Sequence, residues 1–243
     1  MSRFYVSSDS VKDSKIFVKG EEAHHILDVM RLGKLDKVTA FDGTGVEYVG
    51  FIKETARRSL IIEIVETRTP LDKQAAKITL IQAIPKKDKM DYIVEKSTEL
   101  GVNSIIPVIT KRTIPDWDES KKKAQADRWR RITKEASKQC GRTDVPDIRD
   151  ITDFEGALKY STDYDLSLIA ALSDRSIKLR EAFSGFKGGK LAVAIGPEGD
   201  FTKEEIDAAV AMGFKLINLG PRVLKSDTAG LAVLAILNYE LTN

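Results

Sequence analysis

From about residue 73 onward, short apolar runs alternate with segments of helical periodicity, and this alternation limits the fold more than any other feature of the chain. Residues 78–83 and 104–109 are predicted strands, and residues 88–100 between them place apolar side chains at helical spacing. Such a βαβ unit pairs its strands in parallel. Further strands are predicted at 165–171, 191–195 and 215–219. Their continuous apolar runs are typical of parallel strands buried on both faces, so we expect an α/β domain.

The residues before 70 predict a separate, β-rich unit. Residues 38–41 and 47–52 flank the turn-forming Asp42-Gly43-Thr44-Gly45, which favours a hairpin over a dinucleotide-binding loop because no helix follows. Another strand is predicted at 59–65 and a helix at 21–31, with Ile26, Val29 and Met30 on one side. Residues 70–73 read as a linker, and the predicted domains are therefore 1–72 and 73–243.

Charge is distributed unevenly along a chain whose net charge is only +2. Residues 111–142 hold eleven Lys or Arg against five Asp or Glu. Such a concentrated basic segment favours a polyanion partner, and a solvated helix face is the alternative. A single cysteine excludes a disulfide framework and a multi-cysteine metal site. The longest apolar run, 231–237, is too short to cross a bilayer, and we expect a soluble, cytoplasmic protein.

Two loops follow predicted buried strands at their carboxyl ends, where open α/β sheets bind their ligands. The first is residues 195–201, in which Gly196 and Gly199 permit close approach of the backbone to a ligand. Thr202 and Glu205 then form a capping box that begins the next helix. The second loop is residues 219–229, which leads into a helix that is apolar nearly all round. Such a helix must be buried on every side, so we expect it to pack in a subunit interface as well as against the sheet.

Several separated motifs occur along the whole chain in a fixed order. They are His24-His25, Val29-x-Arg31-Leu32, Lys86-Lys87-Asp88-Lys89-Met90-Asp91, residues 95–102, residues 128–146, Gly196-Pro197-Glu198-Gly199 and Leu219-Gly220-x-Arg222-Val223-Leu224-Lys225-x-Asp227-Thr228-Ala229. Together these motifs resemble the RsmE family of SPOUT-class ribosomal RNA methyltransferases.

The resemblance implies a fold and an activity. It implies a small PUA-like RNA-binding β-barrel domain over 1–72 and a SPOUT methyltransferase domain over 73–243, with a parallel sheet and a C-terminal trefoil knot. It also implies S-adenosylmethionine as the cofactor, a homodimer, and methylation of N3 of a uridine in 16S ribosomal RNA of the small subunit. Methyl transfer from a sulfonium is an in-line displacement, so such an enzyme mainly positions its reactants. Because the N3 proton must leave, a base or a cation that stabilises the uridine anion is also needed.

The resemblance also implies roles for particular residues. The catalytic candidates are Arg222, Lys225 and Asp227. The cofactor-binding candidates are Leu172, Ile195, Gly196, Pro197, Glu198, Gly199, Leu219, Gly220, Val223, Leu224, Thr228 and Ala229. The RNA-binding candidates are Arg31, Lys86, Lys87, Arg112, Arg128, Arg131, Lys134, Lys138 and Arg142. No metal is expected, since His24 and His25 point about 100° apart on a helix.

Helical spacing divides the basic segment into two faces. Trp129, Ile132, Ala136 and Cys140 are expected to face the core, with Cys140 a buried apolar residue. Arg131, Lys134 and Lys138 form a separate stripe suited to RNA phosphates, at i, i+3 and i+7.

Three positions depart from the pattern of the family. Asp200 replaces a glycine, Lys225 an arginine and Asp227 a glutamate. Lys cannot reproduce a bidentate guanidinium contact. Two alternatives therefore accompany the uridine-N3 reaction: another SPOUT reaction such as ribose 2′-O methylation, and a non-catalytic RNA-binding ribosome-assembly factor.

Overall fold

The computed structural model describes residues 3–69 and 76–242, and these residues divide into two compact units. One unit comprises Met1–Lys73 together with Ser137–Val145, and the other comprises Gln74–Ala136 together with Pro146–Asn243. The predicted linker at 70–73 and the predicted domain boundary at 72/73 lie outside the described residues. No helix within the described ranges is long and apolar enough to cross a membrane.

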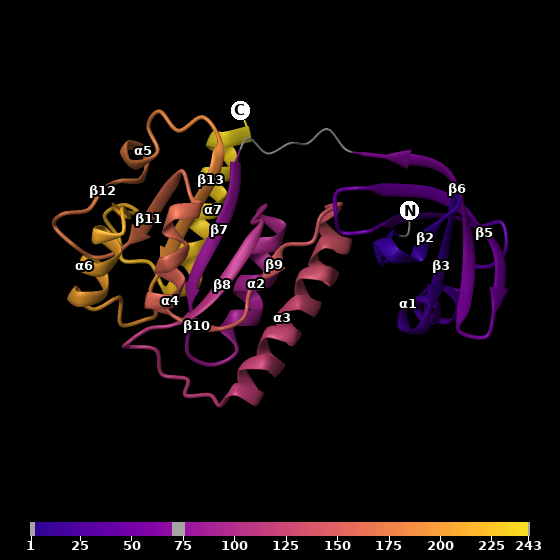
Figure 1. Ribbon diagram of the computed structural model, residues 1–243, viewed down its shortest axis with the longest axis horizontal. Coiled ribbons are helices and arrows are strands. Elements are labelled where there is room, and N and C mark those ends of the chain that lie inside the picture. Colours follow the sequence, from indigo (N-terminus) through magenta and orange to yellow (C-terminus); the bar gives the residue numbers. More distant parts are fainter. Residues whose placement is uncertain (1–2, 70–75, 243) are drawn as a thin grey trace. The chain divides into compact units, whose positions relative to one another are not determined.

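The N-terminal unit is a six-stranded sheet in the order β1-β4-β5-β6-β3-β2. It is coloured from indigo to purple in Figure 1. Among its described strands, β1 and β4 pair in parallel and the other pairs are antiparallel. Its elements are β1 (Arg3–Tyr5), η1 (Ser8–Ser10), β2 (Val11–Lys12), β3 (Lys15–Lys19), α1 (Gly20–His24), η2 (His25–Val29), β4 (Lys37–Phe41), β5 (Glu47–Ala56) and β6 (Ser59–Arg68).

The predicted hairpin is confirmed, since β4 and β5 pair antiparallel with Phe41 opposite Glu47. The Asp42 carboxylate holds the turn by accepting hydrogen bonds from the Thr44 backbone N–H (2.9 Å) and the Tyr48 hydroxyl (3.0 Å). Residues 137–145 join this turn, because the Gly45 N–H donates to the Thr143 carbonyl and the Val145 N–H donates to the Gly43 carbonyl.

The predicted helix at 21–31 is shorter and less regular than expected. It consists of α1 and a turn of π-helix, η2, and Ile26 is buried in the sheet's core. Val29 and Met30 are predicted beside Ile26 but are exposed, because the π-helical turn does not keep the i, i+3, i+4 spacing of an α-helix. His25 packs edge-on against the Phe4 ring.

The second unit is a parallel sheet in the order β10-β8-β7-β13-β11-β14-β12, and β9 also pairs with β8. Every strand pair in it is parallel, which confirms the predicted α/β class. Its elements are β7 (Ala76–Ala83), α2 (Lys89–Glu99), β8 (Ser104–Ile109), α3 (Glu119–Cys140), β9 (Asp147–Ile148), β10 (Thr152–Asp153), α4 (Phe154–Leu158), η3 (Lys159–Asp163), β11 (Leu166–Ala170), β12 (Ile177–Lys178), α5 (Leu179–Ala182), β13 (Gly189–Ile195), α6 (Lys203–Ala211), β14 (Lys215–Asn218) and α7 (Ser226–Thr242). The last residues of α3, from Ser137, belong to the N-terminal unit.

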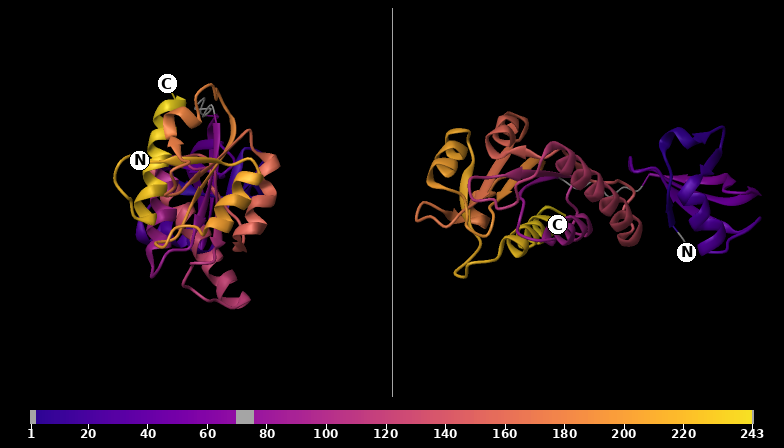
Figure 2. Two further views of the ribbon diagram at one scale, coloured as in Figure 1. Left: turned by 90° about the vertical axis from the view of Figure 1, so that its left-hand side faces the viewer. Right: turned by 90° about the horizontal axis from the view of Figure 1, so that it is seen from below.

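Helices cover both faces of the parallel sheet (Figures 1 and 2). One apolar cluster joins the strands to α2 and α7, and a second joins them to α4 and α6. Burial on both faces explains why the strands read as continuous apolar runs.

One expectation about burial is wrong, and another is not tested by a single chain. Cys140 is exposed, because it is the last residue of α3 and Gly141 turns the chain away with a φ of +87°. Helix α7 is not buried all round within one chain, since Ile236 is 43 % exposed and Tyr239 is 72 % exposed. Its opposite side, with Val233 and Leu237, is fully buried.

Gly50 in β5 tests how tightly the N-terminal sheet is packed. A Cβ at this position would lie within van der Waals overlap of the Glu63 carbonyl oxygen and of the Ile62 side chain. We expect Gly50→Ala to lower the free energy of unfolding by about 2 kcal/mol, as overpacked cores do. Gly33→Ala is the matched control, because a Cβ there meets nothing within 4 Å. Urea unfolding of both variants checks this, and equal midpoints would contradict it.

Candidate active site

A cavity of about 260 Å³ lies where β11, β13 and β14 end. The three strands finish at Ala170, Ile195 and Asn218, and the loops that follow them form the walls. Parallel strands bring their carboxyl ends to one edge of the sheet, so segments far apart in sequence meet here. This is the position that the sequence predicted for a ligand site.

Most of the predicted cofactor-binding residues line this cavity. They are Leu172, Ile195, Gly196, Pro197, Glu198, Leu219, Gly220, Val223, Leu224 and Ala229. Gly199 does not line the cavity, and a Cβ at this position would be 3.3 Å from the Arg112 side chain. Thr228 is exposed on α7 and does not line the cavity either. The sequence did not single out the further lining residues Ala170, Ala171, Ile217, Asn218 and Ser226.

The three catalytic candidates occupy different surroundings. Arg222 and Lys225 line the cavity and are exposed, and neither makes an ion pair with a described residue. Asp227 lies outside the lining and is paired with Lys89, whose Nζ is 3.4 Å from Asp227 Oδ2. Two free cations therefore border the cavity, while the neighbouring acid is already neutralised.

Asp200 explains how a residue other than glycine fits the first loop. Its φ is +60°, a left-handed conformation that Asp tolerates better than most side chains. Its carboxylate accepts hydrogen bonds from the Leu172 N–H (2.9 Å) and from the Phe201 N–H (2.8 Å). Asp200 therefore ties the loop after β13 to the loop after β11, on opposite walls of the cavity.

The first loop is also held from outside by Arg112 and Glu205. The Arg112 guanidinium donates to the Gly199 carbonyl (2.6 Å) and the Phe201 carbonyl (3.3 Å). The predicted capping box of Thr202 and Glu205 is present at the start of α6. The same Glu205 carboxylate accepts from the Lys111 N–H (2.8 Å). These contacts hold the loop in place within the chain.

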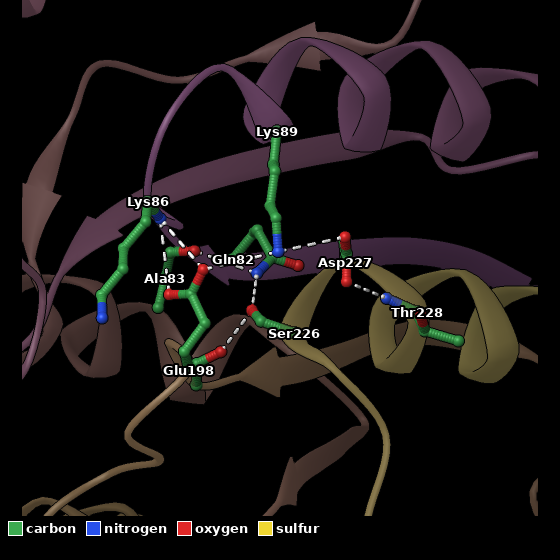
Figure 3. Close-up of polar contacts among 9 residues, drawn as sticks. Gln82, Ala83, Lys86, Lys89, Glu198, Ser226, Asp227 and Thr228 are labelled. Atoms are coloured by element: carbon green, nitrogen blue, oxygen red, sulfur yellow. Dashed lines mark hydrogen bonds and ion pairs between the residues drawn. The ribbon is translucent and has the colours of Figure 1, made fainter.

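Two polar side chains that the sequence analysis did not assign to the site, Gln82 and Lys89, connect the loops to the sheet and to α2 (Figure 3). Gln82 donates to Ser226 Oγ (3.0 Å), and Ser226 donates to the Gly196 carbonyl (2.5 Å). Lys89 Nζ lies between Glu198 Oε1 (3.7 Å) and Asp227. The only sequence signal for Gln82 was a polar residue within an apolar strand, and Lys89 belongs to a motif already noted.

The predicted RNA-binding residues fall into two groups. Some already interact with a partner within the chain, and others make no ion pair with a described residue. Arg128 pairs with Asp91 (2.6 Å), Lys138 with Glu22 (2.9 Å) and Arg142 with Asp144 (2.6 Å). Lys134 is half-buried and also has an interaction within the chain. The side chains of Arg31, Lys86, Lys87 and Arg131 are exposed and make no ion pair with a described residue. No group of three His, Cys, Asp or Glu among the described residues is arranged to hold a metal ion.

Each of the two units contains a region that matches a known protein family. Residues 72–238 match an RNA methyltransferase domain, and residues 18–65 match the PUA domain of RNA methyltransferases. The chain is 29% identical to ribosomal RNA small subunit methyltransferase E of Bacillus subtilis, covering 99% of this chain and 97% of that protein. The same protein of Aquifex aeolicus is 29% identical over 98% of this chain and 99% of its own length.

Solved structures share the fold over the whole chain. The ribosomal RNA small subunit methyltransferase E of Neisseria gonorrhoeae, bound to S-adenosyl methionine, is 30% identical with a TM-score of 0.87, covering 99% of this chain and 98% of that chain. A putative methyltransferase of Legionella pneumophila in complex with S-adenosyl methionine is 29% identical with a TM-score of 0.88, covering 98% and 97%.

The parallel sheet, its edge cavity and the domain match define an RNA methyltransferase. Within that class, the chain belongs to the RsmE family, as its motifs predicted.

Substitutions at Asp200 separate backbone strain from the two hydrogen bonds. Asp200→Gly removes the carboxylate but suits the φ of +60°, whereas Asp200→Ala removes the carboxylate and keeps a Cβ in that conformation. Because a left-handed residue with a Cβ costs about 1 kcal/mol more than glycine, we expect Asp200→Ala to be the less stable of the two by that amount. Thermal unfolding measures the difference, and two variants of equal stability would refute it.

Proposed function

We propose that this protein uses S-adenosylmethionine to methylate N3 of a uridine in 16S ribosomal RNA. The observation that carries the proposal is an apolar cavity at the sheet edge that is lined by two cations, Arg222 and Lys225, which make no ion pair with a described residue. The names of the relatives support the substrate, and the bound ligand of the Neisseria and Legionella proteins supports the cofactor.

The residues present fit S-adenosylmethionine. Leu172, Ile195, Leu219 and Leu224 offer apolar surface for an adenine, and the glycines at 196 and 220 leave the backbone open to a ligand. Both carboxylates of the lining have partners already, since Asp200 accepts two N–H groups and Glu198 is held by the Lys86 N–H and by Lys89. When bound, S-adenosylmethionine would supply the methyl group from its sulfonium.

The chain's own contribution to the chemistry would be electrostatic. Loss of the N3 proton leaves a negative charge on the uridine, and a preorganised cation beside it lowers the cost of that charge. We assign this role to Arg222, with Lys225 beside it in the same loop. Asp227 completes the proposed catalytic group, and its pairing with Lys89 suits a role in balancing charge near the reacting atoms.

RNA contacts are proposed at the exposed cations. Lys86 and Lys87 precede α2, and the Lys86 backbone already contacts Glu198 of the cavity lining, so these side chains are well placed for phosphates near the target base. Arg131 adds a further exposed cation on α3. We also propose that residues 1–72 form the RNA-binding PUA-like domain, with Arg31 among its contacts, and that residues 73–243 form the catalytic domain with the knot. The proposed setting is the cytoplasm, with the assembled small subunit as substrate.

We expect the protein to transfer labelled methyl groups from S-adenosylmethionine to small ribosomal subunits that lack the modification, and N3-methyluridine to appear in the nucleoside digest. Arg222→Ala should reduce this activity by about a hundredfold or more, as removal of one stabilising group does in other enzymes. Mass spectrometry of the nucleosides identifies the product.

The two alternative functions predict different results in this methyl-transfer assay. A 2′-O-methylated nucleoside would keep the fold and change the reaction. Binding of the subunit without any methyl transfer would make the protein a non-catalytic assembly factor.

A homodimer is proposed through α7. Its exposed face, with Ala235, Ile236 and Tyr239, continues the apolar character of a helix whose other side is buried in the core. Ile236→Asp would place a charge in this interface, and we expect it to yield monomers. Sedimentation equilibrium checks this, with Val210→Asp as the control because Val210 is 38 % exposed on α6. A parent protein that sediments as a monomer would refute the dimer.

A further inference from the structure

Gln82 is a buried polar residue in a strand that is otherwise apolar near its end. It is fully buried, between Ile81 and Ala83, and its Cα is paired with Ile195 of β13 on one side and with Pro107 of β8 on the other. Burying an amide is unfavourable unless its hydrogen bonds are made. The presence of Gln82 at this point therefore indicates that its amide has a specific function in the structure around it.

Both hydrogens of the Gln82 amide have acceptors. Nε2 donates to the Ala83 carbonyl (3.0 Å) and to Ser226 Oγ (3.0 Å). The Ser226 hydroxyl has one hydrogen, which it donates to the Gly196 carbonyl at 2.5 Å. We call Gln82, Ser226 and the Gly196 carbonyl the Gln82 relay (Figure 3). Both hydrogen bonds of the relay are donated in the same direction, from Gln82 in the sheet to Ser226 of α7, and from Ser226 to the Gly196 carbonyl in the loop.

Helix α7 is adapted to the relay at Gly230. A Cβ at this position would lie 3.0 Å from Gln82 Oε1, closer than nearly all real contacts of that kind, and 3.7 Å from the Leu80 methyl groups. Glycine inside a helix is unfavourable. Its occurrence here lets the first turns of α7 approach the buried amide, which brings Ser226 within reach.

The relay ends on the wall of the cavity. Gly196 and Ser226 both line it, whereas Gln82 does not. The Gly196 carbonyl is part of the peptide bond between Gly196 and Pro197. A rotation of this carbonyl therefore also moves the first residues of the loop. The hydrogen bond from Gln82 occupies a lone pair of the Ser226 oxygen and so directs the Ser226 hydrogen toward the Gly196 carbonyl.

We propose that Gln82 is a positioning residue of the methyltransferase site, which acts on the cofactor through Ser226 and the Gly196 carbonyl without touching it. The proposal rests on the proposed function, because it assumes that this cavity takes S-adenosylmethionine. Gln82 would set the affinity for the cofactor more than the rate of the chemical step, since its effect falls on the wall of the cavity.

Gln82→Glu tests the direction of the relay with almost no change of shape. An ionised carboxylate cannot donate to Ser226, and it would draw the Ser226 hydrogen away from Gly196. Because burial raises the pKa of such a carboxyl, binding by Gln82→Glu is compared across pH with binding by Gln82→Met, which has no hydrogen to donate. We expect Gln82→Glu to bind S-adenosylhomocysteine about tenfold more weakly in calorimetry, as loss of a buried hydrogen-bond donor does. The KM for S-adenosylmethionine should rise by a similar factor, with kcat at saturation nearly unchanged. Gln82→Met, which removes the donor without adding a charge, serves if Gln82→Glu does not fold.

A double-mutant cycle distinguishes positioning from a general effect on folding. Ser226→Ala should weaken binding as much as Gln82→Glu does, and the double variant should be no weaker than Ser226→Ala alone, because both act through one hydroxyl. Ser226→Thr keeps the hydroxyl and should retain affinity. Ile81→Val, a neighbouring change in the cluster on the other face of the sheet, should lower stability and leave affinity unchanged.

Each contrary outcome has a separate meaning. Parent-like affinity in both Gln82→Glu and Gln82→Met would overturn the role of Gln82, and so would independent, multiplying effects in the double variant. A folded parent protein that binds no S-adenosylhomocysteine would instead overturn the proposed function, and the positioning role with it.

Discussion

The site depends on one row of residues held in register across four parallel strands. Ile195 of β13 is paired with Gln82 of β7 and with Ala170 of β11, and Ala170 is in turn paired with Ile217 of β14. Because this row lies at one level, the loops that leave β11, β13 and β14 begin side by side. Asp200 and Ser226 then join the loops to one another through short hydrogen bonds. These hydrogen bonds hold the walls of the cavity together at the end of the apolar sheet.

Much of the fold could be predicted because its signals are local. The hairpin around Asp42, the strands at 104–109 and 191–195 and the capping box at Thr202 each depend on neighbouring residues, and each is present. The two loops were predicted as a site because strand ends and glycines are also local signals. Their individual roles came from the motifs.

The parts that sequence reasoning missed depend on contacts between distant residues. Gln82 and Ser226 are 144 positions apart, so no periodicity relates them. In a similar way, a count of charges in the basic segment does not reveal that Arg128 and Lys138 form ion pairs with Asp91 and Glu22. Cys140 matched the apolar face of a helix whose end no local pattern marked. Tertiary partners, rather than propensities, decided these positions.

The N-terminal unit is built from two separate stretches, Met1–Lys73 and Ser137–Val145. During synthesis on the ribosome, the turn at Gly43 and Gly45 therefore waits for its partners until residue 145 has left the exit tunnel. By then β7, α2, β8 and the part of α3 that belongs to the other unit have also emerged. Synthesis of the two units therefore overlaps, because the N-terminal unit is completed only after Gln74–Ala136 of the other unit have been translated.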